Sequence, residues 1–226
     1  YIIPISINQI GEFGHGDSFH PLISSDGRFI AYLSKAANLE SGGASIIQNL
    51  FLHDRNLKRT NIISENVDKF RMSSNGRIFA ISPKGGSKPD YLMDILTNKR
   101  VDIGKNPFNG EFLSNVTIND LSYDGRYSGL IAPQALSIKP IINPDGEDIF
   151  IYERYQDQVL ELPTDNLRMS TSDTPPILSI SGDGRTVVFQ TFPMYLSSTI
   201  QSPQSCPCNR VLDQLRPLNT NTPRLE

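Results

Sequence analysis

Residues 24–32 read Ser24-Ser25-Asp26-Gly27-Arg28-Phe29-Ile30-Ala31-Tyr32, a polar turn sequence followed by an apolar run. The same pattern, Ser-x-[Asp/Asn]-Gly-Arg and then apolar residues, occurs four times in the chain. Its Asp or Asn falls at positions 26, 75, 124 and 183, so the spacings are 49, 49 and 59 residues. A pattern that recurs at a nearly constant period is typical of a protein built from stacked structural repeats.

Each copy of the pattern predicts a β-hairpin. Asp-Gly or Asn-Gly between apolar runs favours a tight turn in which both central residues have positive φ. We expect a strand before each turn, and after it a second strand that is apolar on both faces because neighbouring sheets cover it. The expected pairs are 19–24 with 29–34, 69–73 with 78–82, 119–122 with 127–131, and 176–181 with 186–191.

Three of the repeats continue with two further strands separated by a polar turn. The expected strands are 49–54 with 60–64, 90–95 with 100–103, and 148–153 with 159–162. Four antiparallel strands in a repeat of this length are the signature of a β-propeller blade. The fourth repeat is interrupted by prolines and by Cys206 and Cys208, and residues 210–215 are its expected third strand.

The predicted fold is therefore all-β, a β-propeller of four-stranded antiparallel blades with about four blades in this chain. A small ring and a part of a larger ring both remain open. We expect one propeller domain over residues 1–215, followed by an extended tail over 216–226. An outermost strand is expected from Ile2 to Ile7, completing the last blade or belonging to another one. The repeats lie at about 18–64, 68–104, 118–163 and 175–215.

The composition excludes several classes of function. The chain has 226 residues, 38% of them hydrophobic, and a formal net charge of -3. This balance is typical of a soluble globular protein, and it offers no basic excess for nucleic acid. No apolar run approaches the roughly 20 residues that a membrane-spanning helix needs. The chain begins at Tyr1 without a methionine, so we expect a processed product from which a signal peptide was removed, an excised domain, or a chain whose start is missing.

The repeat resembles the TolB-type (WD40-like) propeller repeat. The resemblance rests on the first repeat, Pro21-Leu22-Ile23-Ser24-Ser25-Asp26-Gly27-Arg28-Phe29-Ile30-Ala31-Tyr32-Leu33-Ser34, and on Asp148-Ile149-Phe150-Ile151-Tyr152. It covers nearly residues 1–191 and implies a fold rather than a function. Because such repeats are common in envelope and secreted bacterial proteins, it also implies an exported location, periplasmic or extracellular.

The sequence contains no recognised catalytic motif. There is no Gly-x-Ser-x-Gly elbow, His-Glu-x-x-His or Walker loop, and we therefore predict no catalytic residues and no enzyme activity. His15, Asp17 and Ser18 share one segment, whereas the partners of a catalytic triad converge from separate segments. The four motif arginines are expected to pair with carboxylates or backbone carbonyls in their own blades rather than to form an anion site.

Metal sites are not expected. The two cysteines are too few for a zinc site, which needs about four ligands, and the three histidines are scattered over other segments without ligand spacing. The loop containing Asp145 and Asp148 resembles a loose calcium loop, but it lacks alternating acids, and an ordinary turn is the preferred interpretation.

We expect a non-enzymatic scaffold that binds other protein subunits in an envelope or membrane-associated complex. Two alternatives are open: a binder of small molecules or glycans at the mouth of the propeller channel, and the propeller domain of a larger hydrolase. Recognition residues are expected on loops. The candidate binding residues are His15, Asp17, Phe19, His20, Phe108, Phe112, Phe192 and Tyr195.

Overall fold

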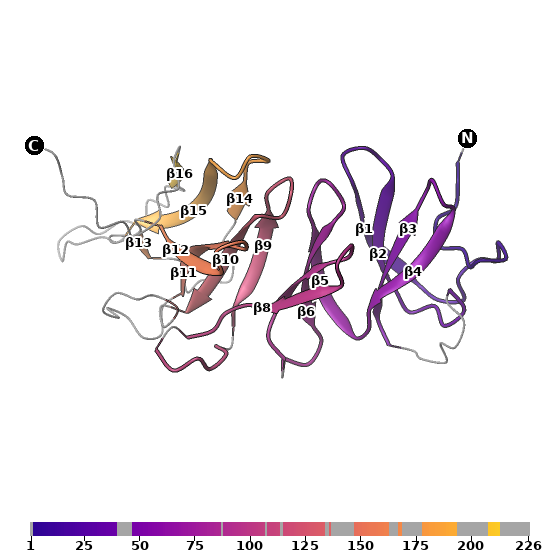
Figure 1. Cartoon of the computed structure of the whole chain (residues 1–226), viewed down its shortest axis with the longest axis horizontal. Helices are drawn as coiled ribbons and strands as arrows, with labels where there is room; N and C mark the ends of the chain where they lie inside the picture. Colours follow the sequence, from indigo (N-terminus) through magenta and orange to yellow (C-terminus); the bar gives the residue numbers. More distant parts are fainter. Residues whose placement is uncertain are drawn as a thin grey trace, which may run out of the picture. The chain divides into compact units, whose positions relative to one another are not determined.

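The computed structural model describes residues 2–39, 47–86, 88–106, 108–113, 115–133, 136, 147–162, 167–168, 178–193 and 208–212. Within these residues the regular structure is β, in four antiparallel sheets of four strands, and it includes no α-helix (Figure 1). Each sheet contains one copy of the Ser-x-[Asp/Asn]-Gly-Arg pattern, which confirms the prediction of blades.

The first three sheets are regular meanders in which each strand pairs with the next along the chain. Blade 1 consists of β1 (Ser18–Ile23), β2 (Phe29–Ser34), β3 (Asn49–Asp54) and β4 (Arg59–Ser64). Blade 2 consists of β5 (Val67–Met72), β6 (Ile78–Pro83), β7 (Tyr91–Asp94) and β8 (Lys99–Asp102). Blade 3 consists of β9 (Thr117–Leu121), β10 (Tyr127–Pro133), β11 (Glu147–Glu153) and β12 (Gln158–Glu161).

The fourth sheet departs from this order. Its central strand β15 (Val187–Pro193) pairs with β14 (Leu178–Ile180) and with β16 (Cys208–Leu212), which is the predicted third strand placed slightly earlier in the chain. Its fourth member is β13 (Leu167–Arg168), which precedes β14 in the sequence and pairs with the far end of β15.

The chain packs as two compact units. The first contains blades 1 and 2 together with Tyr123–Gly125, and the second contains blades 3 and 4. In the first unit, Ala31 and Leu33 of β2 join Phe79 and Ile81 of β6 in one apolar core. In the second unit, buried residues of β11 and β12 form a core with those of β14 and β15. A blade therefore buries its faces by stacking on a neighbour, as repeat proteins do.

The hairpin turns differ in type from the prediction. In the first turn the Gly27 N–H donates to Ser24 O over 2.8 Å, and Gly27 has a φ of 69°. Ser25 and Asp26, between them, do not have positive φ. The turn thus consists of four residues, Ser24 to Gly27, and its last residue is a left-handed glycine, an arrangement that differs from the two-residue primed turn. The same bond closes the turns that end at Gly76 and Gly184.

The predicted strand from Ile2 to Ile7 is wrong. The only bridge in this segment joins Ile7 to Phe13, and the Ile7 N–H donates to Ile5 O over 2.8 Å, which makes a local turn. The segment is therefore not assigned to a strand of any sheet. Ile5 instead packs against a buried cluster that includes Tyr32 and Phe51 of blade 1.

Candidate functional site

The serine and the Asp or Asn of the repeat pattern hold its turn together through side-chain hydrogen bonds. In blade 2 the Ser73 hydroxyl donates to Asn75 Oδ1 over 2.8 Å and accepts from the Ile78 N–H over 2.8 Å. Asn75 Oδ1 also accepts from the Arg77 N–H over 3.0 Å. The serine is fully buried, so these bonds satisfy polar groups that would be costly to leave unpaired. Blade 1 repeats the arrangement with Ser24 and Asp26.

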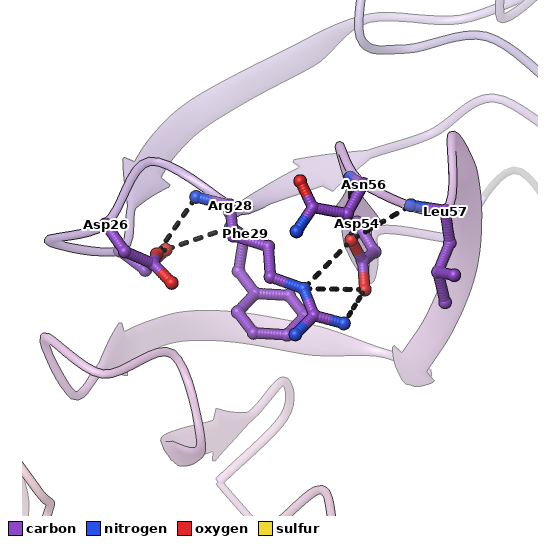
Figure 2. A network of polar contacts seen from close by, with 7 residues as sticks. Asp26, Arg28, Phe29, Asp54, Asn56 and Leu57 are labelled. Carbon is purple, nitrogen blue, oxygen red and sulfur yellow. Dashed lines mark hydrogen bonds and ion pairs between the residues drawn. The ribbon is translucent and has the colours of Figure 1, made fainter.

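The motif arginine pairs with the carboxylate at the end of the third strand of its own blade. Arg28 donates to both oxygens of Asp54, with Nη2 to Oδ2 at 2.7 Å (Figure 2). Arg77 makes a two-bond pair with Asp94, and Arg126 Nε donates to Glu153 over 2.7 Å. The predicted structural role of these three arginines is confirmed.

Each paired carboxylate also holds the next turn of its blade. Asp54 Oδ1 accepts from the backbone N–H groups of Asn56 and Leu57 (Figure 2). The Arg28 guanidinium, together with these N–H donors, holds the pKa of Asp54 below its usual value. In blade 2 the Arg77 guanidinium lowers the pKa of Asp94 to about 2. These carboxylates are charged at neutral pH and are committed to structure.

The glycine of the pattern is a packing position as well as a turn position. A Cβ on Gly76 would lie 2.6 Å from Phe29 Cδ2, the residue that follows Arg28 in the preceding repeat. Ile78 takes the same place at Gly125, and Tyr127 takes it at Gly184. We call this arrangement a glycine socket: the apolar residue after one motif arginine lies directly against the turn glycine of the next repeat.

Gly27 has no such neighbour within the described residues. The atoms nearest to a Cβ there are Arg55 Nη1 at 3.5 Å and Ile23 Cδ1 at 4.0 Å. A pocket of about 500 Å³ opens beside it, which we call the blade-1 pocket. It is bounded by the two turns of blade 1 on one side and by the N-terminal segment on the other. Its lining residues are Ile3, Pro4, Ile5, Ile7, Asp26, Gly27, Arg28, His53, Arg55, Asn56 and Lys58.

His53 presents a hydrogen-bond acceptor in this pocket. Its Nδ1 lies 3.0 Å from Thr60 Oγ1, and the Thr60 hydroxyl donates its one proton to Ile7 O over 3.2 Å. Nδ1 is therefore assigned as the protonated nitrogen, which leaves Nε2 with a lone pair. Burial lowers the pKa of His53; nearby Asp54 acts in the opposite direction and Arg55 in the same direction as burial. The imidazole is neutral at pH 7.

The turn from β3 to β4 makes the pocket cationic. It reads Arg55-Asn56-Leu57-Lys58, with two positive charges, and the Arg55 guanidinium donates to Gly27 O over 2.9 Å. Lys58 has a φ of 51°, in a region that Asn and Asp enter more readily than lysine. The same turn position holds Asn98 in blade 2 and Asp157 in blade 3, with φ of 55° and 53°.

Four of the sequence-predicted binding residues lie on one segment of the first unit. His15 and Asp17 are exposed before β1, and the His15 N–H donates to Asn38 Oδ1. Phe19 and His20 are neighbours in β1, with ring centroids 5.4 Å apart. Phe19 packs against the core that blade 1 shares with blade 2, so its bulk is structural. None of the four lines the blade-1 pocket.

The other four predicted residues belong to the second unit. Phe108 is 72% exposed, Phe112 is 41% exposed, and Lys105 Nζ lies 5.4 Å from the Phe112 ring centroid. Phe192 pairs through its backbone with Arg168 of β13. Tyr195 lies outside the described residues.

The predicted acidic loop is described only at one end. Asp148 is buried in β11 and accepts from the Ile149 N–H, while Asp145 lies outside the described residues, as does Cys206. No cluster of three or more His, Cys, Asp or Glu side chains suited to a metal ion occurs in the part of the chain that the structure describes. Nor do those residues include a helix with the length and apolarity for crossing a membrane.

The sequence did not predict the lining of the blade-1 pocket, because no single residue of that lining belongs to a recognised functional motif. An alignment of the repeats on their turns would have shown that blade 1 differs from the other blades at two of these positions. The position of His53 holds Met93 in blade 2 and Tyr152 in blade 3, and Lys58 stands where the other blades have Asn or Asp. The part that Ile3 to Ile7 play in lining this pocket was not predicted, because the sequence pattern indicated a strand in that segment.

This chain is similar in structure to several solved proteins. The acylaminoacyl peptidase of Pyrococcus horikoshii matches with a TM-score of 0.51 and 13% identity, over 88% of this chain and 32% of that chain. TolB from Acinetobacter baumannii matches with a TM-score of 0.49 and 12% identity, over 88% and 44%. The β-propeller domain of the Trilobed protease from Pyrococcus furiosus matches with 0.49 and 16%, over 86% and 52%.

These likenesses concern the fold alone, because the identities are low. The chain spans about a third to a half of the length of the structures it matches. No protein-family model matches it, and no curated protein matches it.

Proposed function

We propose that this chain is a non-enzymatic β-propeller module that binds another protein, as a scaffold subunit of an envelope or membrane-associated complex outside the cytoplasm. The observation that carries the proposal is the blade-1 pocket of about 500 Å³. It is lined by apolar and cationic side chains, the combination of apolar surface and a few placed polar groups that binding sites use.

The chemistry of the pocket favours binding over catalysis. Arg28 is held by Asp54, and Asp26 accepts from Ser24 and from the Arg28 N–H. His53 is neutral, but no hydroxyl or thiol nucleophile lines the pocket beside it. A nucleophile with its base within hydrogen-bond reach is what covalent catalysis requires. The exported location rests on the resemblance of the repeat to TolB-type repeats.

The test is gentle purification of the protein from the cells that produce it, followed by native mass determination. We expect a complex of fixed stoichiometry that Lys58→Glu disrupts. Lys99→Glu is the matched control, because Lys99 is exposed at the start of β8 in the neighbouring blade and does not line the pocket. A native mass equal to that of one copy of the unmodified protein would contradict the proposal.

The propeller domain of a hydrolase is the second candidate function. It is favoured by the match to a peptidase structure with a TM-score of 0.51. In that case a hydrolase segment accompanies the propeller in the complete coding sequence, with a nucleophile elbow of the Gly-x-Ser-x-Gly type. Reading that sequence decides this candidate. A glycan binder, the remaining alternative, would use exposed aromatic residues such as Phe108 and Phe112, and a glycan array tests it.

A further inference from the structure

Two places in the sequence combine an asparagine with a following glycine, Asn75-Gly76 and Asn109-Gly110. This dipeptide is chemically labile in water, because the glycine nitrogen can attack the side-chain amide carbon of the asparagine. The attack closes a five-membered succinimide ring, which water then opens to aspartate or to isoaspartate. Glycine favours the reaction because it has no side chain to shield the nitrogen or to restrict the backbone. The surroundings of each asparagine determine whether its ring can close.

The turn of blade 2 holds Asn75 in a form that cannot close the ring. Its Oδ1 accepts from the Ser73 hydroxyl over 2.8 Å and from the Arg77 N–H over 3.0 Å. Its own N–H donates to Tyr123 O over 3.0 Å. Gly76 is buried, and its N–H donates to Ser73 O over 2.8 Å. Ring closure needs the side chain and the backbone to rotate together, so these contacts would have to break first.

Asn109 lies instead at the tip of a short hairpin that joins β8 to β9. The two arms of the hairpin meet in the backbone bridge between Lys105 and Phe112. Asn109 and Gly110 are both exposed. Among the described residues, no atom beyond the chain neighbours of Gly110 lies within 4 Å of where a side chain would begin on it. The surroundings therefore leave room for the backbone movement that ring closure requires.

The bonds that hold Asn109 come from residues of the same tip. Its Oδ1 accepts from the Glu111 N–H over 3.0 Å, and its Nδ2 donates to Glu111 Oε2 over 3.0 Å. The Gly110 N–H donates to Asn106 O over 2.9 Å. The two side-chain bonds are exposed to water, and a local fluctuation of the tip breaks all three while the sheets stay folded. The reactive form is thus reached without unfolding.

From this contrast we propose that Asn109 is a site of spontaneous deamidation in the folded protein, whereas Asn75 reacts only when its blade unfolds. The Gly110 nitrogen forms a bond to Asn109 Cγ, and the bond from Cγ to Nδ2 breaks. Ammonia leaves with the proton of the Gly110 N–H. Water then adds to one of the two carbonyl carbons of the ring and gives aspartate or isoaspartate. The inference goes beyond the proposed function and does not depend on it.

Reaction at this tip changes the part of the surface that presents two exposed aromatic side chains. Phe108 and Phe112, which are 72% and 41% exposed, lie on either side of the reactive dipeptide. The aspartate product adds a negative charge beside Glu111. The isoaspartate product inserts one extra carbon into the backbone of the tip, so the bridge between Lys105 and Phe112 is expected to break. Isoaspartate would thus alter how the two rings meet a ligand.

The test is incubation of the purified, folded protein at mildly alkaline pH, followed by tryptic digestion and mass spectrometry. The peptides to compare are 106–126, which contains Asn109, and 72–77, which contains Asn75. We expect the mass increase of an amide-to-carboxyl exchange at Asn109, at a rate at least about tenfold that at Asn75. Enzymatic methylation of isoaspartate should label peptide 106–126.

Incubation in guanidinium chloride is the control for the role of the fold. Once the chain is unfolded, the two Asn-Gly sites should react at similar rates, because the contacts of the blade 2 turn are gone. Asn115 and Asn119 lie in the same tryptic peptide as Asn109 but precede valine and aspartate, so they serve as internal controls that stay unmodified.

The Asn109→Gln variant confirms the site. It keeps an exposed amide, but its longer side chain would have to close a six-membered ring, which forms much more slowly, so the mass change should disappear. Equal rates at Asn75 and Asn109 in the folded protein would overturn the proposal. So would an Asn109 that stays intact in the folded protein while both sites react in the unfolded chain.

Discussion

Phe29 occupies the space that a side chain on Gly76 would need, and this contact joins the turn of one blade to the second strand of the other. The turn backbones meet at the same place, where the Ser25 N–H donates to Ser74 O over 2.7 Å. The repeat pattern therefore encodes the stacking of blades 1 and 2 as well as the hairpin of each blade.

Replacing Gly76 with alanine should destabilise the first unit by about 2–4 kcal/mol. The left-handed backbone costs about 1 kcal/mol for a side chain, and displacing the Phe29 ring adds an overpacking cost of about 1–3 kcal/mol. Gly27→Ala is the matched control, since it has a similar φ but ordinary contacts, and it should cost only about 1 kcal/mol. Urea unfolding of both variants measures the difference. Equal losses would contradict the packing role of the socket.

Acid should destabilise the blade through Asp94. The pKa of Asp94 in the folded chain is about 2, below its ordinary value of 3.8, because it accepts hydrogen bonds from Arg77. The unfolded chain thus takes up the proton first, and the stability that Asp94 contributes is present above pH 3.8 and is lost as the pH falls toward 2. The contribution is at most about 2 kcal/mol before solvent screening.

The Asp94→Asn variant isolates this contribution. We expect it to be less stable at pH 7 and to lose less stability than the unmodified protein between pH 4 and pH 2, as followed by thermal unfolding. Parallel stability curves for the two proteins across that range would show that the pairing with Arg77 does not raise stability.

His53 should give a second pH dependence in a different range. Burial lowers the pKa of His53 in the folded chain below its ordinary value of 6.5. Between the folded and unfolded values the unfolded chain binds more protons, so stability falls as the pH drops below about 6.5. The positive charge of Arg55 also disfavours protonation of His53. His53→Gln should remove this part of the dependence, measured by thermal unfolding at pH 7.5 and pH 5.5.

Tyr32 offers a substitution that should not weaken the fold. Its side chain is buried, and its hydroxyl makes no hydrogen bond of ordinary geometry within the described residues, although the Thr60 side chain lies close enough to act on its pKa. Burial raises the pKa of Tyr32 to about 12. Because Tyr32→Phe removes an unpaired buried group and keeps the ring that stacks on Phe51, stability should be unchanged or higher by about 1 kcal/mol. A loss above that size would indicate a partner such as a bound water.

The strands could be predicted because each repeat combines a turn with two apolar runs. The observed β2, β6 and β10 start at the predicted residues, Phe29, Ile78 and Tyr127. The turn type could not be predicted from Asp-Gly alone, since the buried Ser24 hydroxyl supplies the bonds that select a different turn. That serine is part of the repeated pattern, but its role depends on burial.

The candidate site was less accessible to prediction. Loop aromatics such as Phe108 were chosen because recognition residues gather on loops, yet the pocket lies at short turns of regular length. Its signal is a difference between repeats, the lysine at position 58 where Asn98 and Asp157 stand elsewhere. Residues Ile3 to Ile7 line the pocket because their segment, which forms no regular strand, packs against blade 1. The local hydrogen bonds that shape this segment cannot be predicted from a pattern of polar and apolar residues.

The ion pair between the motif arginine and the end of the third strand lies at one end of each of the first three blades. At that end the connections have the same length in the first three blades: five residues from Ser24 to Arg28 and four from Arg55 to Lys58, with their counterparts. At the opposite end, between the second and third strands, the connections span 35–48, 84–90 and 134–146. We therefore expect the blades to tolerate insertions at the end where the connections vary in length, and to be disrupted by insertions at the end that carries the ion pair. A reporter peptide inserted between Gly85 and Gly86 should leave blade 2 folded, because no other atom lies within 4 Å of where a side chain would begin at either glycine. The same peptide inserted between Asp26 and Gly27 should unfold blade 1.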